Sequence, residues 1–239
     1  MVRQVIKCVL DSGIISDFHI IDNSPSDSLR KECADERCKY QHLGKNIGFG
    51  PGHNIAIRAS VSEFHVVINP DIYFEKSSLD CMLQFMKTHP DVGLLSPKVC
   101  FPDGSTQYLC RRYPSVFSLS VRRFMPFFLK KHFQSTLDYS EMRDTGYNRQ
   151  MDIEFASGCF MFFRRSFLLS VNGFDERFFL YFEDMDLSYR LSMISRVVFN
   201  PETVVFHHWQ RGSYKSLKLM FYNILSSIRF FNKHGWKFI

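Results

Sequence analysis

Short apolar runs typical of β-strands alternate with segments of helical periodicity over residues 18–96. Strands that alternate with helices usually pair in parallel, so this pattern predicts an α/β fold with a doubly wound sheet. The predicted strands cover 18–21, 40–43, 64–68 and 92–96, and the predicted helices cover 26–34, 52–60 and 77–88.

The second half of the chain is less regular. Residues 102–153 are basic and aromatic, and we expect them to form an insertion over a sheet edge. Further strands are predicted at 154–163, 197–199 and 204–206, with a helix from 183 to 194. A last helix over 213–234 is predicted to be amphipathic, with the apolar stripe Leu217, Phe221, Ile224, Ile228 and Phe231. We therefore expect a catalytic domain over 1–212 and a basic C-terminal helix over 213–239.

Length and composition exclude several classes of protein. A chain of 239 residues with 45% hydrophobic residues can bury one sizeable core and is not disordered. It has no apolar run long enough to cross a membrane and no secretory signal at its start. Its seven scattered cysteines complete no zinc motif. These features predict a reduced, cytoplasmic protein.

The net charge of +6 is distributed unevenly. The segments 104–137 and 203–239 each carry six Lys or Arg residues and no Asp or Glu, which leaves a net charge of 6 − 6 − 6 = −6 for the rest. Basic segments attract phosphate-rich partners such as nucleic acid, pyrophosphate lipids or an anionic membrane. We do not expect nucleic acid, because the sequence contains no known nucleic-acid-binding motif.

An acidic cluster, Glu183, Asp184 and Asp186, lies among aromatic residues. Crowded carboxylates raise one another's proton affinity, which suits a group that must accept a proton near neutral pH. Acidic residues are also common in the first turn of a helix, where they interact with the helix dipole. Spacing alone favours the helix start, and the aromatic surroundings favour a catalytic base.

Polar residues follow two predicted strands, and a glycine-rich turn lies between them. Asp22 ends the first strand, and Asn69-Pro70-Asp71 ends the strand at 64–68. Ligands of open α/β sheets bind beyond the carboxyl ends of strands, so these residues predict a nucleotide site. A carboxylate such as Asp71 can bind a divalent cation that bridges phosphates, and His207 or His208 could complete the shell. Each motif taken alone is also a common turn.

These motifs form a series along the chain. It consists of Ile21-Asp22-Asn23-Ser24, Asn46-Ile47-Gly48-Phe49-Gly50 with Asn54, Asn69-Pro70-Asp71, Ala156-Ser157-Gly158, Gly173-Phe174-Asp175-Glu176, Tyr181-Phe182-Glu183-Asp184-Met185-Asp186-Leu187 and His207. In this order the series resembles the family 2 glycosyltransferases, and most of all the rhamnosyltransferase branch of bacterial polysaccharide and O-antigen synthesis.

The resemblance implies a GT-A fold, a mixed sheet flanked by helices, and an inverting reaction with a nucleotide sugar. It makes Asp184 the general base, with Glu183 and Asp186 in support. It makes Asp71 and His207 the ligands of Mg²⁺ or Mn²⁺. The residues implied at the donor nucleotide are Asp22, Asn23, Asn46, Gly48, Phe49, Asn54 and Asn69, and those implied at the acceptor are Ser157, Gly158 and Asp175.

The expected reaction moves a sugar, with rhamnose from dTDP-rhamnose as the leading candidate and UDP-sugars as others. The expected acceptor is a saccharide or a polyprenyl-diphosphate-linked saccharide, with peripheral contact to the inner face of the cytoplasmic membrane. The opening strand of the family has no counterpart in this sequence, so a gap in the sheet is expected. The alternative is a truncated, non-catalytic remnant that binds sugar nucleotide weakly or not at all.

Overall fold

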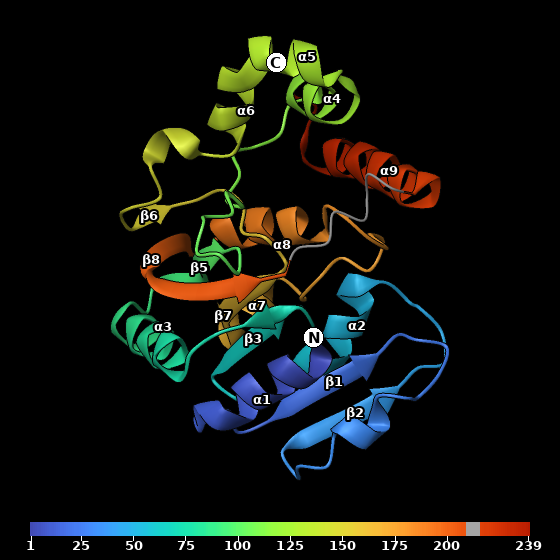
Figure 1. Cartoon of the computed structure of the whole chain (residues 1–239), viewed down its shortest axis with the longest axis vertical. Helices are drawn as coiled ribbons and strands as arrows, with labels where there is room; N and C mark the ends of the chain where they lie inside the picture. The colour runs from blue at the N-terminus through green and yellow to red at the C-terminus, as the bar shows by residue number, and fades with distance from the viewer. Residues whose placement is uncertain (209–215) are drawn as a thin grey trace.

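The computed structural model describes residues 1–208 and 216–239. Figure 1 shows a central sheet with a small strand pair and two helices at one end and a group of helices at the other. The helices are α1 Val2–Ser12, α2 Phe49–Ala59, α3 Lys76–Thr88, α4 Val116–Phe124, α5 Phe127–Lys130, α6 Gln134–Ser140, α7 Arg165–Ser170, α8 Glu183–Ser192 and α9 Leu217–His234. The strands are β1 Phe18–Asp22, β2 Cys38–His42, β3 Phe64–Ile68, β4 Ile72–Tyr73, β5 Val92–Cys100, β6 Met151–Asp152, β7 Phe160–Arg164 and β8 Arg196–His207.

The main sheet mixes parallel and antiparallel pairs. Within the described residues its strand order is β3-β7-β5-β8-β4, with β6 also paired to β8. Strands β5 and β8 run parallel, whereas β7 lies antiparallel between β3 and β5. The mixed sheet is therefore confirmed, and the expectation of uniformly parallel pairing is wrong. The alternation of strands and helices could not reveal that β7, which comes much later in the chain, is inserted between β3 and β5.

Strands β1 and β2 form a separate parallel pair. A cavity of about 770 Å³ lies between β1 and β3, and side chains of both strands line it, together with the apolar face of α1. Among the described residues, β1 pairs with β2 alone and β3 with β7 alone, so both strands turn an unpaired edge toward this cavity. The cavity confirms the expected gap in the sheet.

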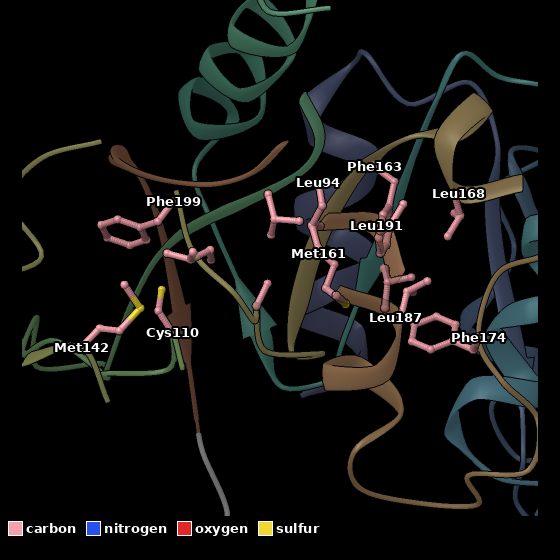
Figure 2. Close-up of a cluster of buried hydrophobic side chains, with 14 of the residues drawn as sticks. Leu94, Cys110, Met142, Met161, Phe163, Leu168, Phe174, Leu187, Leu191 and Phe199 are labelled. Atoms are coloured by element: carbon pink, nitrogen blue, oxygen red, sulfur yellow. The ribbon is translucent and has the colours of Figure 1, made fainter. Parts of the chain in front are cut away.

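The core lies on both faces of the main sheet. On β7, Phe160 and Phe162 pack against α1 and α3, while Met161 and Phe163 pack against α7 and α8. This alternation follows from the two-residue period of a strand. Figure 2 shows the second of these layers, in which Leu187 and Leu191 of α8 contact the sheet. The layer fixes the start of α8, where the acidic cluster lies.

Several predicted elements have different bounds in the structure. The predicted helix at 26–34 reduces to a 3-10 turn, Arg30–Glu32. The strand predicted at 154–163 begins only at Phe160, and the two strands predicted around Asn200-Pro201 are one strand, β8. A bulge opposite Pro97 and Lys98 absorbs the extra residues of β8. The predicted start of the last helix and the boundary at 212/213 lie outside the described residues.

The insertion at 102–153 contains α4, α5 and α6, which gather with α9 at one end of the molecule (Figure 1). Helix α9 buries Phe230 and Phe231 against Phe155, Phe178 and Phe182. The other side of α9 is exposed. None of the helices in the described parts of the chain combines the length and the hydropathy needed to cross a bilayer.

Candidate active site

Asp22 lies at the carboxyl end of β1, on the rim of the large cavity. Its carboxylate accepts hydrogen bonds from the backbone N–H of Ser24 at 2.8 Å and from the hydroxyl of Tyr40 at 2.7 Å. Burial alone would raise the pKa of Asp22, but these hydrogen bonds outweigh it and the pKa is lowered. The Asp22 carboxylate is therefore held in one orientation and favours its ionised form, so it can accept a hydrogen bond from an N–H group of a nucleobase.

The glycine-rich turn between β2 and α2 approaches the end of β1. Asn46 Oδ1 accepts from the backbone N–H of Gly48, and Asn23 Nδ2 donates to the carbonyl of Gly48 at 3.0 Å. Gly48 has a φ of 104°, and a Cβ there would lie 2.7 Å from the carbonyl oxygen of Phe179. Only glycine fits this position. The turn starts α2 at Phe49, whose ring borders the cavity.

Asn54 does not face the cavity. Its Nδ2 donates to the carbonyl of Phe174 and to Glu176, and its Oδ1 accepts from the backbone N–H of Phe174 at 2.9 Å. These bonds join α2 to the loop that precedes α8. The structure thus gives Asn54 a role in holding the loop, whereas sequence reasoning assigned it to the donor nucleotide.

Asp71 follows β3 and lines the same cavity as Asp22, and its carboxylate lies close to His207. Strand β4 pairs with the end of β8, so that Ile72 lies opposite His207. Asp71 Oδ1 lies 3.3 Å from His207 Nε2, yet this buried oxygen receives no hydrogen bond among the described residues. Neighbouring His208 instead packs on the ring of Tyr73.

Gln107 explains the orientation of His207. Its Nε2 donates to the carbonyl of His207 at 2.8 Å, which leaves its Oε1 to accept from His207 Nδ1 at 3.0 Å. This assigns the proton to Nδ1 and directs the lone pair of Nε2 toward Asp71. Sequence reasoning missed Gln107, because 100 residues separate it from His207 and no motif surrounds it.

This pair fits a divalent cation. Two acceptors, a carboxylate oxygen and an imidazole lone pair, face each other at 3.3 Å. Ligands that bind one ion at about 2.0–2.2 Å with octahedral angles lie roughly 2.8–3.1 Å apart, so the separation of this pair is close to that of two metal ligands. Within the described residues no cluster of three or more His, Cys, Asp or Glu side chains could hold a metal, so the pair would supply two ligands only. Diphosphate oxygens and water would supply the others, as Mg²⁺ commonly requires.

Asp184 occupies the first turn of α8, after Tyr181 and Phe182, which both have positive φ values (69° and 65°). Such backbone is rare outside glycine and marks a constrained turn. Asp184 accepts from the backbone N–H of Gly158 and of Met185, both at 2.9 Å. Burial nevertheless raises its pKa above the ordinary value. A positioned carboxylate with a raised pKa is suited to accept a proton near neutral pH.

Glu183 lies beside Asp184 and is buried. Burial, followed by the charge of Asp184, raises the pKa of Glu183 well above its usual value. Its Oε2 is buried without a hydrogen-bond partner among the described residues. The acidic cluster therefore lies in the first turn of α8, and two of its members, Glu183 and Asp184, have raised pKa values.

Asp186 and Asp175 lie elsewhere, which corrects their expected positions at the base and the acceptor. Asp186 is fully buried and accepts from Arg190 at 2.8 Å, Lys233 at 2.6 Å and His234 at 2.7 Å. Asp175 pairs with Arg177 and with Lys233. Hydrogen bonds, first from Arg177, lower the pKa of Asp175. Both acids anchor α9, and neither lines a cavity with Asp184.

Asp184 and Glu183 face a second cavity, of about 280 Å³. Ser157 lines it too, while Gly158 connects it to the donor side: a Cβ on Gly158 would meet both Asp184 and Phe49. The backbone N–H of Asn69 donates to the carbonyl of Cys159. Burial raises the pKa of the Cys159 thiol, and the charges of Asp184 and Asp71 raise it further. The two cavities therefore adjoin at residues 157–159.

The fold is that of GT-A glycosyltransferases. GalNAc-T7 with UDP, GalNAc and Mn²⁺ superposes with a TM-score of 0.64 at 12% identity, over 95% of this chain and 44% of that one. A mannosyltransferase of Pyrobaculum calidifontis in complex with GDP-Man and Mn²⁺ gives 0.60 at 14% identity, over 98% and 61%. At these identities the likeness concerns the fold alone.

Sequence relatives point to one family. An N-acetylglucosaminyl-diphospho-decaprenol L-rhamnosyltransferase of Mycobacterium tuberculosis is 29% identical over 209 residues, 82% of this chain and 66% of the relative. The rhamnosyltransferase WbbL of Escherichia coli is 27% identical over 205 residues, 80% and 73%. The chain thus spans just under two thirds of the mycobacterial relative. Residues 1–171 match the profile of glycosyl transferase family 2, and the chain belongs to that family.

Proposed function

We propose that this chain is the catalytic domain of an inverting glycosyltransferase. It transfers a sugar, rhamnose from dTDP-rhamnose first among the candidates, to a saccharide carried on a polyprenyl diphosphate. The main support is the position of Asp184, a half-buried carboxylate with a raised pKa that adjoins the Asp71–His207 pair through residues 157–159. A base on one side of a reacting centre and a diphosphate site on the other would account for this arrangement, which supports catalysis over a non-catalytic remnant.

On the donor side, each residue holds one part of the nucleotide sugar. Asp22 accepts from the nucleobase, and Phe49 and Gly52 at the start of α2 line the large cavity. Asp71 and His207 face the diphosphate. A divalent cation held by this pair would neutralise charge on the leaving diphosphate.

On the acceptor side, Asp184 removes the proton of the attacking hydroxyl. The backbone N–H groups of Gly158 and Met185 fix both carboxylate oxygens, so that the base keeps one orientation. Burial raises the pKa of Glu183, which disfavours a second charge beside the base. Attack from the face opposite the diphosphate inverts the anomeric centre. The departure of the diphosphate needs no general acid, unlike the leaving group in inverting glycosidases.

The C-terminal helix supports a location at the inner face of the cytoplasmic membrane. Four of the five residues of its expected stripe are exposed: Leu217 (80%), Phe221 (63%), Ile224 (38%) and Ile228 (42%). Only Phe231 of the stripe is buried, so the stripe does not serve to pack α9 on the domain. Nearby α4 and α5 expose Phe124 and Phe128. Apolar helix faces with Lys and Arg beside them bind the interface of anionic bilayers.

A transfer assay tests this function. The purified chain is incubated with Mn²⁺ and dTDP-rhamnose, UDP-GlcNAc or GDP-mannose, and with a polyprenyl-diphosphate-linked N-acetylglucosamine. We expect transfer from one of the deoxythymidine or uridine donors, with inverted anomeric configuration of the product by NMR. Retention of configuration, or no transfer from any donor by a folded protein, would contradict the proposal.

A further inference from the structure

The 280 Å³ cavity beside Asp184 has a basic wall that the reaction described so far does not use. Arg111, Arg122 and Arg123 all line it, opposite Glu183 and Asp184. Two of the three arginines come from α4, which lies in the insertion at 102–153. The cavity therefore joins the proposed base to a group of guanidinium groups.

Two of these arginines, Arg111 and Arg122, are held in place by neighbouring residues. Arg111 lies 3.6 Å and Arg122 3.4 Å from the carboxylate of Glu141, and Arg122 also donates to the hydroxyl of Ser140 at 2.9 Å. Arg111 donates to the carbonyls of Tyr108 and Cys110 as well. Side chains fixed in this way lose little freedom when a ligand binds, which favours affinity.

The charges of the cavity do not cancel. Three guanidinium groups line it against two carboxyl groups, those of Glu183 and Asp184. Among the groups that line this partly enclosed space, guanidinium groups therefore outnumber carboxyl groups by 3 − 2 = 1. Arginine binds phosphate oxygens through paired N–H groups, and such charge-assisted bonds are stronger in an enclosed site than in water.

The residues around the cavity indicate what kind of ligand it could bind. Leu119 of α4 and Asn223 of α9 line it, so it lies between the two helices. Those helices expose Phe124 (62%) and Phe221 (63%) to solvent. A ligand with a hydroxyl at Asp184, an anionic group at the arginines and an apolar chain between α4 and α9 matches all three features. The donor cannot supply this anion, because its diphosphate site at Asp71 lies in the other cavity.

We propose that Arg122 and Arg123 bind the diphosphate of a lipid-linked acceptor and so direct its sugar toward Asp184. This inference rests on the proposed transferase function. It assigns the insertion at 102–153 a role in acceptor selection rather than in donor binding.

Kinetics with two acceptors test it. One acceptor is N-acetylglucosaminyl diphosphate on a farnesyl chain, and the other is a neutral farnesyl glycoside of the same sugar. Arg122→Gln, Arg123→Gln and the double variant are compared with Lys131→Gln, an exposed cation that does not line the cavity. Circular dichroism and thermal melting verify that each variant is folded, and Arg122→Lys serves as the conservative replacement.

We expect KM for the diphosphate acceptor to rise at least tenfold in each arginine variant, with kcat within about twofold, because a charge-assisted contact is lost. KM for the neutral acceptor and for the donor should stay unchanged, and Lys131→Gln should match the wild type. Equal effects on both acceptors, or no effect on either, would overturn the proposal. A wild-type protein that transfers to neither acceptor would instead refute the transferase function itself.

Direct binding provides a second measurement. Farnesyl diphosphate is titrated into the protein in EDTA, so that no divalent cation holds it at Asp71. We expect binding that weakens at least tenfold in the double variant, and much weaker binding of inorganic pyrophosphate. Binding that the double variant retains would overturn the proposal. Equal affinity for pyrophosphate would overturn the assignment of a lipid-borne ligand.

Discussion

Replacing Gln107 with methionine tests the orientation of His207. Gln107 is 2% exposed, and methionine is close to it in size, so the change removes polar groups and leaves the volume nearly constant. It removes the bond to His207 Nδ1 at 3.0 Å and the bond to the His207 carbonyl at 2.8 Å. Without them the imidazole can rotate and place its proton on either nitrogen.

The size of the effect follows from those two bonds. Loss of a group that orients a metal-binding histidine typically weakens metal affinity by about 10–100-fold, which is roughly 1.4–2.7 kcal/mol. Each buried polar group left unpaired costs about 1–3 kcal/mol, so we expect the free energy of unfolding to fall by about 2–5 kcal/mol.

Mn²⁺ titration in the presence of UDP measures the first effect, and urea unfolding measures the second. Gln84→Met, an exposed position on α3, is the matched control and should change neither. If Gln107→Met binds Mn²⁺ as tightly as the wild type, His207 is not oriented for a metal and the reasoning about its tautomer is refuted.

Three further changes have expected outcomes. The pKa of Glu183 is raised in the folded state, so its protonated form stabilises the fold at low pH. This contribution disappears as pH rises through the folded pKa. Glu183→Gln should therefore raise Tm more at pH 8 than at pH 5. A Tm gain that does not depend on pH would contradict this. Asp186→Asn should destabilise the fold by about 3–5 kcal/mol in urea unfolding, since it removes the buried charge that Arg190 and Lys233 both bind. An unchanged unfolding midpoint would show that Asp186 does not anchor α9. The double variant Phe221→Asp, Ile228→Asp should bind phosphatidylglycerol vesicles at least about tenfold more weakly in co-sedimentation. Val61→Asp, at an exposed site on another part of the molecule, should bind them as the wild type does. Equal binding by the wild type and both variants would refute membrane contact through α9.

Residues next to strand ends and glycines lie at the positions in the fold that the sequence predicts. Asp22, Asp71 and Gly48 could be placed because the chain turns sharply beside them, and the turn residues are visible in the sequence. Strand β3 was predicted with its correct bounds for the same reason, since it ends at Asn69-Pro70. The gap between β1 and β3 could be expected from the family pattern, but the size of the cavity could not.

Contacts between distant segments could not be predicted. Asp186 and Asp175 carry the same charge as Asp184 and lie near it in the sequence, yet Lys233 of α9 binds both. Asn54 is likewise engaged by a loop 120 residues away. A motif shows which residue types are present, whereas the side of the helix that each one faces depends on packing that a single sequence does not contain.

The central claim is that Asp184 is the base of a sugar transfer. The most direct measurement compares Asp184→Asn with the wild type and with Asp11→Asn, an exposed carboxylate on α1. Turnover with dTDP-rhamnose, Mn²⁺ and the lipid-linked acceptor should fall about 10²–10⁴-fold in Asp184→Asn alone. Binding of dTDP with Mn²⁺ should remain as in the wild type, since Asp22, Asp71 and His207 are untouched. Full turnover by a folded Asp184→Asn protein would contradict the account.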